Sequence, residues 1–351
     1  MKIFFVTGFL GSGKTTAIIG AAKSLVSRGL RVGVVTNDQG RYLVDHNFVG
    51  AQGIATVSVS GGCFCCNYDE FEQHVLTLQK DEQPDLVFAE SVGSCTDVLA
   101  TVVKPLMDIQ KEYGGSVSTF VDSRLLERRV YGKPLPFSDS IVYIFDKQIE
   151  EAQVLVVNKR DLLPGDVIDD LVRDAKEAFG VELVLAHSAH EEGDAERWLE
   201  AAESALALKP GPSMEVDYER YGRGEAELAW LDAQLLLKGP AVVENVNSAI
   251  TSFHHEVVSR GYPIGHIKLF AKTDRGAFKV GVVNNDDELE LLSDSGTKEV
   301  NLTLNARVQT TPAALEELYN TTFVPAVTDV LVESEVQAFK PGFPRPTHRV
   351  S

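Results

Sequence analysis

Three of the chain's four cysteines lie within four residues, in the run Gly61-Gly62-Cys63-Phe64-Cys65-Cys66. Thiolates bind soft and borderline metal ions, and sulfurs one and two residues apart on an irregular loop can converge on one ion. Two other interpretations stay open, because Cys63 and Cys66 also have the CxxC spacing of a redox pair and buried cysteines also serve as packing residues. The run predicts a transition-metal site at Cys63, Cys65 and Cys66, with Zn²⁺ or Co²⁺ favoured.

A phosphate-binding loop precedes the cysteines. Residues 8–15 fit the GxxxxGK[ST] pattern, with a buried strand expected at 3–6 and a helix at 16–28. Such a loop turns backbone N–H groups toward phosphate oxygens, while its lysine offers positive charge and its threonine hydroxyl binds magnesium. The predicted phosphate site consists of Gly8, Gly11, Ser12, Gly13, Lys14, Thr15 and Thr16.

Acidic residues follow two further predicted strands. A strand at 31–36 ends in the turn Asn37-Asp38-Gln39-Gly40, and an apolar strand at 84–89 ends at Glu90, which begins an ExxG motif. Ligands collect at such strand ends, so Asp38 and Glu90 are predicted to bind magnesium and the Gly93 N–H to sense the γ-phosphate. Either acid is also compatible with an ordinary turn or strand-end role. The predicted catalytic set is Lys14, Thr15, Asp38 and Glu90.

The identity of the base is indicated further along the chain. A buried strand at 152–157 leads into an NKxD motif at 158–161. An aspartate there accepts hydrogen bonds from the N1–H and the exocyclic amine of guanine, whereas the N1 of adenine carries no proton. The lysine stem can pack on the base plane. After a last strand at 181–186, a backbone contact to the guanine oxygen is expected. GTP is therefore predicted rather than ATP, at Asn158, Lys159, Asp161, Ser188 and Ala189.

Taken together, these motifs resemble those of the CobW family of metallochaperone GTPases, relatives of the nickel-insertion GTPases that serve urease and hydrogenase. The resemblance rests on GFLGSGKTT at 8–16, GGCFCC at 61–66, ExxG at 90–93 and QIEEAQVLVVNKRDL at 148–162. It implies a GTPase that binds a transition metal at the cysteines and supplies the ion, or a metal-dependent activation, to a client metalloprotein. It also leaves open a homodimer formed around the nucleotide.

Two stretches depart from the family pattern. Family members usually carry Asn-Glu where this chain has Asn37-Asp38, so the carboxylate here is one methylene shorter. They carry a GLADP-like stretch where this chain has Ser94-Cys95-Thr96-Asp97, and Cys95 is either a packing residue or a thiol near the switch. The eight histidines are scattered, so stored metal is not indicated. Three that were considered as metal ligands are better read as surface or core residues, namely His254, His255 and His266.

Length and composition limit the class of protein. The 351 residues suffice for two domains with separate cores. A net charge of −18 argues against nucleic-acid binding, and no stretch approaches the ~20 apolar residues of a membrane span, so neither partner is expected. Few, clustered cysteines favour the reducing cytoplasm.

We predict an α/β fold, a P-loop NTPase with a mostly parallel sheet flanked by helices, at residues 1–212. A linker at 209–212 leads to a ferredoxin-like α+β domain at 213–338, and an extended, mobile tail follows at 339–351. In the second domain, periodicity predicts strands at 228–237, 264–273, 277–283 and 300–308 and helices at 243–260 and 312–322. The family resemblance assigns this domain the client surface.

The leading hypothesis is that the loops around Asp38 and Glu90 become ordered when GTP and magnesium bind, which shapes the cysteine site, and that hydrolysis loosens it. The alternative is a conformational chaperone that uses GTP to open a metalloenzyme or corrinoid protein for cofactor loading without donating its ion. A small-molecule P-loop kinase is disfavoured by the NKxD motif. No residue stands out for orienting the attacking water, so slow intrinsic hydrolysis is expected.

Overall fold

The computed structural model describes residues 1–207, 211–293 and 296–350, and its contacts divide the chain into two compact units. The first unit comprises Met1–Gln39, Gln52–Gly224 and Pro344–Ser351, and the second comprises Gly40–Ala51 and Glu225–Phe343. The predicted domains follow one another along the chain, whereas these units interleave. Residues 209–210 of the predicted linker lie outside the described residues.

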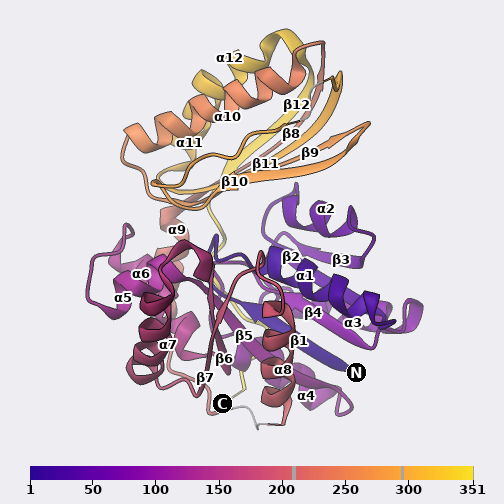
Figure 1. The fold of residues 1–351 in the computed structure, drawn as a ribbon, viewed down its shortest axis with the longest axis vertical. Helices are drawn as coiled ribbons and strands as arrows, with labels where there is room; N and C mark the ends of the chain where they lie inside the picture. The colour runs from indigo at the N-terminus through magenta and orange to yellow at the C-terminus, as the bar shows by residue number, and fades with distance from the viewer. Residues whose placement is uncertain (208–210, 294–295, 351) are drawn as a thin grey trace. The chain divides into compact units, whose positions relative to one another are not determined.

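The first unit is built on a parallel sheet. Its strand order, β3-β2-β4-β1-β5-β6-β7, agrees with the predicted α/β class (Figure 1). Because all strands point the same way, their carboxyl ends lie along one edge of the sheet. The strands are β1 Lys2–Thr7, β2 Val32–Asp38, β3 Ala55–Ser60, β4 Leu86–Glu90, β5 Gly114–Asp122, β6 Val154–Asn158 and β7 Leu183–His187.

Helices cover both faces of this sheet, and the alternation of side chains along β1 shows why. Phe4 packs on Phe88, which contacts Trp198 of α8, while the next residue, Phe5, packs on Phe71 of α3. A strand buried on both faces needs such consecutive apolar residues. The helices of this unit are α1 Lys14–Ser27, α3 Tyr68–Asp81, α4 Lys104–Ile109, α5 Ser123–Val130, α6 Asp139–Glu150, α7 Gly165–Phe179 and α8 Asp194–Leu206, and α9 Tyr218–Glu227 leads into the second unit.

Two strands of the first sheet differ from the prediction. The strand-like run at 118–122 of the sequence forms the end of β5, which lies in the interior of the sheet between β1 and β6. Its sequence, GGSVSTFVD, is rich in glycine and serine, which weakens the strand pattern. β3, at the opposite edge of the sheet from β7, was not predicted, because its side chains are mostly only half-buried. The helix predicted at 16–28 begins two residues earlier, at Lys14.

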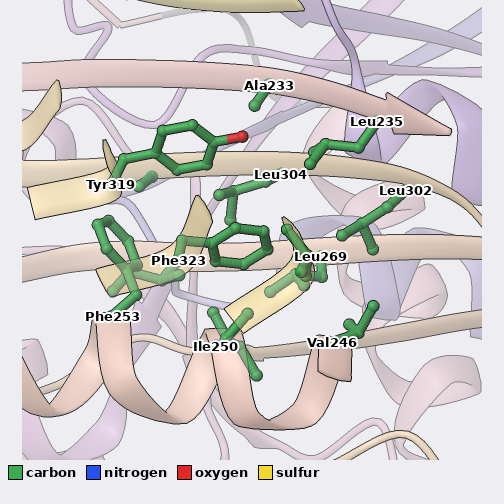
Figure 2. Packing of buried hydrophobic residues seen from close by; sticks show 14 of the residues in the cluster. Ala233, Leu235, Val246, Ile250, Phe253, Leu269, Leu302, Leu304, Tyr319 and Phe323 are labelled. Carbon is green, nitrogen blue, oxygen red and sulfur yellow. The ribbon is translucent and has the colours of Figure 1, made fainter. Parts of the chain in front are cut away.

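The second unit contains a separate antiparallel sheet of order β10-β9-β11-β8-β12, with three helices along one face (Figure 1). Side chains of α10 and of the turn after α11 interlock with alternate residues of the strands (Figure 2). In the part of the chain that is described, no helix is both long and apolar enough to cross a membrane. The elements are β8 Leu228–Lys238, α10 Val242–Ser259, β9 Ile264–Thr273, β10 Gly276–Val282, β11 Glu299–Gln309, α11 Pro312–Leu318, α12 Val324–Val327 and β12 Leu331–Phe339.

This α+β unit follows the predicted β-α-β-β-β-α order and then adds β12. That edge strand pairs with β8, and most of its side chains are exposed, so it lacks the buried alternation by which the other strands were predicted. The helix predicted at 312–322 is interrupted, because a π-helical turn at Tyr319–Phe323 separates α11 from α12. The π-helical turn brings Tyr319 and Phe323 into a stacked pair above the sheet.

The opposite face of the second sheet receives α2 Val44–Gly50, which follows β2 in the sequence. Asp45 of α2 accepts hydrogen bonds from Lys268 (2.7 Å) and Lys279 (2.8 Å). Burial would raise the pKa of Asp45, but the two ammonium groups hold it well below its ordinary value. Phe48 packs edge-to-face on Phe270. The residues immediately after the first predicted switch are thus an integral part of the second unit.

Replacement of Asp45 by asparagine is expected to loosen this unit, because two part-buried lysines would lose their shared anion. We predict a loss of about 2 kcal/mol, the usual worth of a charge-assisted hydrogen bond pair, seen as faster hydrogen exchange of β9 and β11 amides. The matched control is Glu299→Ala, which removes an exposed ion pair with Lys238 and is expected to change exchange little. Equal protection in Asp45→Asn and wild type would contradict the prediction.

Candidate functional site

The phosphate loop lies against β5, an interior strand of the first sheet. Gly8 has φ of +123°, and a Cβ there would lie 2.0 Å from the carbonyl oxygen of Phe120 in β5. Gly13 has φ of +89°, and a Cβ there would meet the side-chain amide of Asn158 at 2.4 Å. Only glycine fits both places. The absence of a Cβ at these two glycines lets the loop backbone pack directly against β5 and the NKxD motif.

Lys14 and Thr15 follow the loop at the start of α1 and are almost fully buried. The Lys14 ammonium donates to the carbonyl oxygens of Gly8 (2.6 Å) and Phe9 (3.2 Å). The Thr15 hydroxyl donates to Glu90 Oε1 at 2.8 Å. The structure thus brings together two of the residues predicted to bind magnesium, a hydroxyl and a carboxylate from elements 75 positions apart.

Asp38 is the last residue of β2 and pairs in register with Ser60 of β3. β2 is the neighbour of β4, which ends at Glu90, so both acids lie at the carboxyl edge of the sheet. Gly93 packs tightly on the phosphate loop, since a Cβ there would lie 2.7 Å from Leu10 Cδ2. The ExxG segment and the phosphate loop are therefore in direct contact.

The NKxD motif is tied to the phosphate loop and to two neighbouring strands. Asn158 donates to the carbonyl of Ser12 (2.6 Å), and its Oδ1 pairs with His187 Nδ1 (2.7 Å). Lys159 has φ of +60° and donates to Asp122 at 2.8 Å. Burial would raise the pKa of Asp122, but the charges of Lys159 and of the nearby Arg124 lower it to about 2. Asp122 therefore fixes the lysine of the motif.

The remaining base-site residues lie beyond β6 and β7. Asp161 is exposed, as is Ala189. The Ser188 N–H donates to Asp194 at 2.7 Å, and Asp194 also pairs with Arg160. The turn at 188–189 is thus pinned to the start of α8 through the Ser188 amide.

The cysteine run lies on the loop between β3 and α3, and Asn37 holds that loop. Its side-chain amide donates to the carbonyl oxygens of Val59 (3.1 Å) and Gly62 (2.7 Å), and its Oδ1 accepts from the Phe64 N–H (2.9 Å). Phe64 is buried and packs on Phe71 of α3. The loop is thereby anchored to the end of β2, one residue before Asp38.

The three sulfurs converge as the sequence pattern requires of a metal site. Cys63 Sγ lies 2.8 Å from Cys65 Sγ and 3.2 Å from Cys66 Sγ, and the latter two are 3.9 Å apart. Hydrogen bonds from the neighbouring thiols hold the pKa of Cys63 well below its usual value. The hydrogen bond to Cys63 raises the pKa of Cys65, and it raises the pKa of Cys66 to about 11. All four cysteines are free thiols. Among the described residues, this is the cluster whose donor atoms suit a metal ion.

Four residues of this site were not among the predicted site residues. Asn37 belongs to the predicted turn at 37–40 and Gln148 to the stretch 148–162 that resembles the family, whereas Asp122 and His187 belong to no predicted motif. Gln148 donates to the carbonyl oxygens of Gly93 (3.1 Å) and Cys95 (2.7 Å). Each of the four joins segments distant in sequence, so only the folded chain reveals its partners.

The geometry defines a P-loop nucleotide-binding unit that carries a cysteine cluster. The family model described as "CobW/HypB/UreG, nucleotide-binding domain" matches residues 2–181. The chain belongs to this family. It is 28% identical over 180 residues to the zinc chaperone CobW of Sinorhizobium sp, an alignment that covers 45% of this chain and 50% of the relative.

Two further relatives are a zinc chaperone and a urease accessory protein. The zinc chaperone YeiR of Escherichia coli is 28% identical over 192 residues, covering 53% of this chain and 54% of YeiR. The urease accessory protein UreG of Metallosphaera sedula is 33% identical over 172 residues, covering 45% of this chain and 72% of UreG. The chain thus spans about half the length of the two zinc chaperones that it matches.

The buried His187 is expected to make the free energy of unfolding of the first unit depend on pH. Burial, with the charges of Arg160 and Arg197, lowers its pKa from 6.5 to about 4. Between these values the unfolded chain binds a proton that the folded chain does not, so stability falls as the pH drops through this window. The loss approaches about 3 kcal/mol when the pH reaches 4.

The measurement is urea unfolding of the first unit at pH 7 and pH 4.5. His187→Gln is expected to be less stable at pH 7, because its ring packs on Trp198, but to lose less stability on acidification than wild type. His190→Gln is the matched control, since His190 is exposed and lies three residues after His187. An unchanged pH dependence in His187→Gln would overturn the assignment.

Proposed function

We propose that the chain is a GTP-hydrolysing metallochaperone that binds a transition metal at Cys63, Cys65 and Cys66 and delivers it to a client metalloprotein. The observation that carries the proposal is the convergence of three thiols, all within 4.8 Å of one another, in the same unit as the phosphate loop. Zinc chaperones among the relatives support zinc as the ion, and cobalt suits the same donor set.

The phosphate end of the nucleotide is assigned to the glycine loop and to the residues that follow it. Lys14 would exchange its contacts with the Gly8 and Phe9 carbonyls for phosphate oxygens. The adjacent hydroxyl of Thr15 and carboxylate of Glu90 are hard oxygen donors that fit Mg²⁺, with Asp38 on the neighbouring strand. The ion neutralises charge on the phosphate oxygens when bound.

The base end is assigned to the NKxD motif. Asp161 would accept from guanine N1–H and from the exocyclic amine, while Lys159, fixed by Asp122, lies along the base. At the turn that follows β7, the Ser188 amide is already used by Asp194, which favours the exposed Ala189 for the contact to the guanine oxygen. This arrangement supports a preference for GTP over ATP.

Nucleotide and metal sites share their supports. Asn37 anchors the cysteine loop and immediately precedes Asp38, while Gln148 holds both Gly93 and Cys95. A change in the loops around Asp38 and Glu90 would therefore alter the spacing of the sulfurs. We propose that GTP favours the closed cysteine site and that hydrolysis loosens it for transfer.

The second unit supplies the surface proposed for the client. It bears a hollow of about 1150 Å³ beside α2, lined among others by His46, Phe270, Lys272 and Asn301. Since α2 follows the first switch directly, the hollow is connected through the chain to the nucleotide site. A reducing compartment such as the cytoplasm would keep the thiols available. A homodimer around the nucleotide belongs to the same proposal.

Asp161→Asn is expected to weaken GTP binding about 100-fold, because the guanine N1–H would lose its acceptor and face an amide N–H or a weaker oxygen. Xanthosine triphosphate, which has a carbonyl in place of the amine, is expected to bind the variant better than wild type. Titration calorimetry with GTP, ATP and xanthosine triphosphate measures this. Asp166→Asn, at an exposed carboxylate in α7, is the matched control. Unchanged GTP affinity in Asp161→Asn would sink the base-site assignment.

Cys65→Ala is expected to lower zinc affinity roughly 100-fold while guanine-nucleotide binding is retained. Mutation of a residue that only supports a metal ligand already lowers metal affinity about 10- to 100-fold. Zinc stoichiometry and competition against a chelating dye measure the effect under reducing conditions. Ser60→Ala, an exposed residue at the start of the loop, is the control and is expected to match wild type. Unchanged zinc affinity and stoichiometry in Cys65→Ala would remove the ion from this loop.

A further inference from the structure

Cys95 lies beside the cysteine loop although it belongs to a different segment of the chain. It follows the ExxG motif, its side chain is 2% exposed, and its N–H donates to the carbonyl of Val92 at 3.0 Å. Its own carbonyl accepts from Gln148 at 2.7 Å. These backbone contacts give the thiol a fixed position in the first unit.

The Cys95 thiol points to the cluster rather than to an apolar wall. It hydrogen-bonds to Cys63, the sulfur that already contacts both Cys65 and Cys66, and it also interacts electrostatically with Cys65. The sulfurs of Cys63, Cys65 and Cys66 lie within 4.8 Å of one another, and Cys95 joins this cluster through Cys63. A cysteine that served only for packing would contact carbon atoms, whereas the Cys95 thiol has the Cys63 thiol as its hydrogen-bond partner.

The C-terminal segment joins the two cysteine segments. The Arg345 N–H donates to Cys66 Sγ at 3.2 Å, and the Thr347 N–H donates to the Cys65 carbonyl at 2.8 Å. Arg349 then pairs with Asp97, two residues beyond Cys95, at 2.7 Å. The tail, expected to be mobile, instead links the cysteine loop to the segment that carries Cys95, and its N–H group stabilises sulfur charge.

We propose that Cys95 is the fourth protein ligand, so that Cys63, Cys65, Cys66 and Cys95 enclose one borderline-soft divalent cation such as Zn²⁺ or Co²⁺ in a tetrahedral site. This rests on the proposed metal-binding function of the three-cysteine loop. Zn–S bonds of 2.3 Å in a tetrahedron require sulfurs about 3.8 Å apart. The sulfurs of Cys65 and Cys66 are already 3.9 Å apart. Cys63 Sγ, now 2.8 and 3.2 Å from them, would move away from both when the ion binds.

The fourth thiolate changes what the site does. Binding one divalent ion to four thiolates releases the thiol protons and leaves a charge of −2, whereas three thiolates leave −1 and an open position. Because Cys95 follows the ExxG motif, the metal would bridge the cysteine loop and the segment expected to respond to the γ-phosphate. Withdrawal of Cys95 would open the fourth position to a ligand from the client.

Zinc-edge X-ray absorption of the full-length chain, purified with a reductant and loaded with zinc alone, tests the proposal. The expected first shell is four sulfurs in wild type and three sulfurs with one oxygen or nitrogen in Cys95→Ser. Zinc affinity is expected to fall at least tenfold in Cys95→Ser and Cys95→Ala. Circular dichroism and guanine-nucleotide binding show that each variant is folded.

Two results would overturn the proposal, and they differ in what else they affect. A first shell of three sulfurs in wild type, with unchanged zinc affinity in Cys95→Ala, would remove Cys95 and leave the three-cysteine site standing. Absence of zinc binding by wild type would instead remove the metal function itself. The wild-type sulfur count decides the question even if both variants misfold.

Discussion

The structure around the cysteine loop depends on the side chain of Asn37. One amide at the end of β2 satisfies a carbonyl of β3 and two backbone groups of the loop between β3 and α3, at 2.7 to 3.1 Å. Such hydrogen bonds contribute about 1 kcal/mol each to stability. Their larger effect is geometric, because they fix where Cys63, Cys65 and Cys66 lie relative to the carboxyl edge of the sheet.

The same edge carries the groups that would hold a nucleotide. Thr15 meets Glu90, Asn158 meets the phosphate loop, and Lys159 is fixed by Asp122. These contacts are formed by buried or part-buried side chains, so the site is organised before a ligand binds. Gln148 extends the organisation to the ExxG segment and to Cys95. The proposed metal and nucleotide sites therefore share a framework of strand ends.

Local sequence was sufficient for much of this. The glycine loop, the strand-end acids, the NKxD motif and the cysteine run each carry their chemistry in adjacent residues, and β1, β2, β4 and β6 show strong buried patterns. The α/β class and the family followed from them. The half-buried β3 and the exposed β12 gave weak patterns, and the glycine- and serine-rich β5 concealed its central place.

What the sequence did not reveal are contacts between distant segments. The tail at 345–350 crosses the cysteine loop, and residues 40–51 fold with the second unit. Neither arrangement has a local sequence pattern, because each depends on contacts between segments that are distant in the sequence. The role of Asn37 is of the same kind, since an asparagine in a turn is ordinary until its three partners are known.

The central claim is that the nucleotide state controls the cysteine site. Zinc affinity measured by chelator competition, on one preparation bound to a non-hydrolysable GTP analogue, to GDP or to no nucleotide, tests it most directly. The account predicts the tightest zinc binding with the GTP analogue and weaker binding with GDP. Equal zinc affinity in all three states would contradict it.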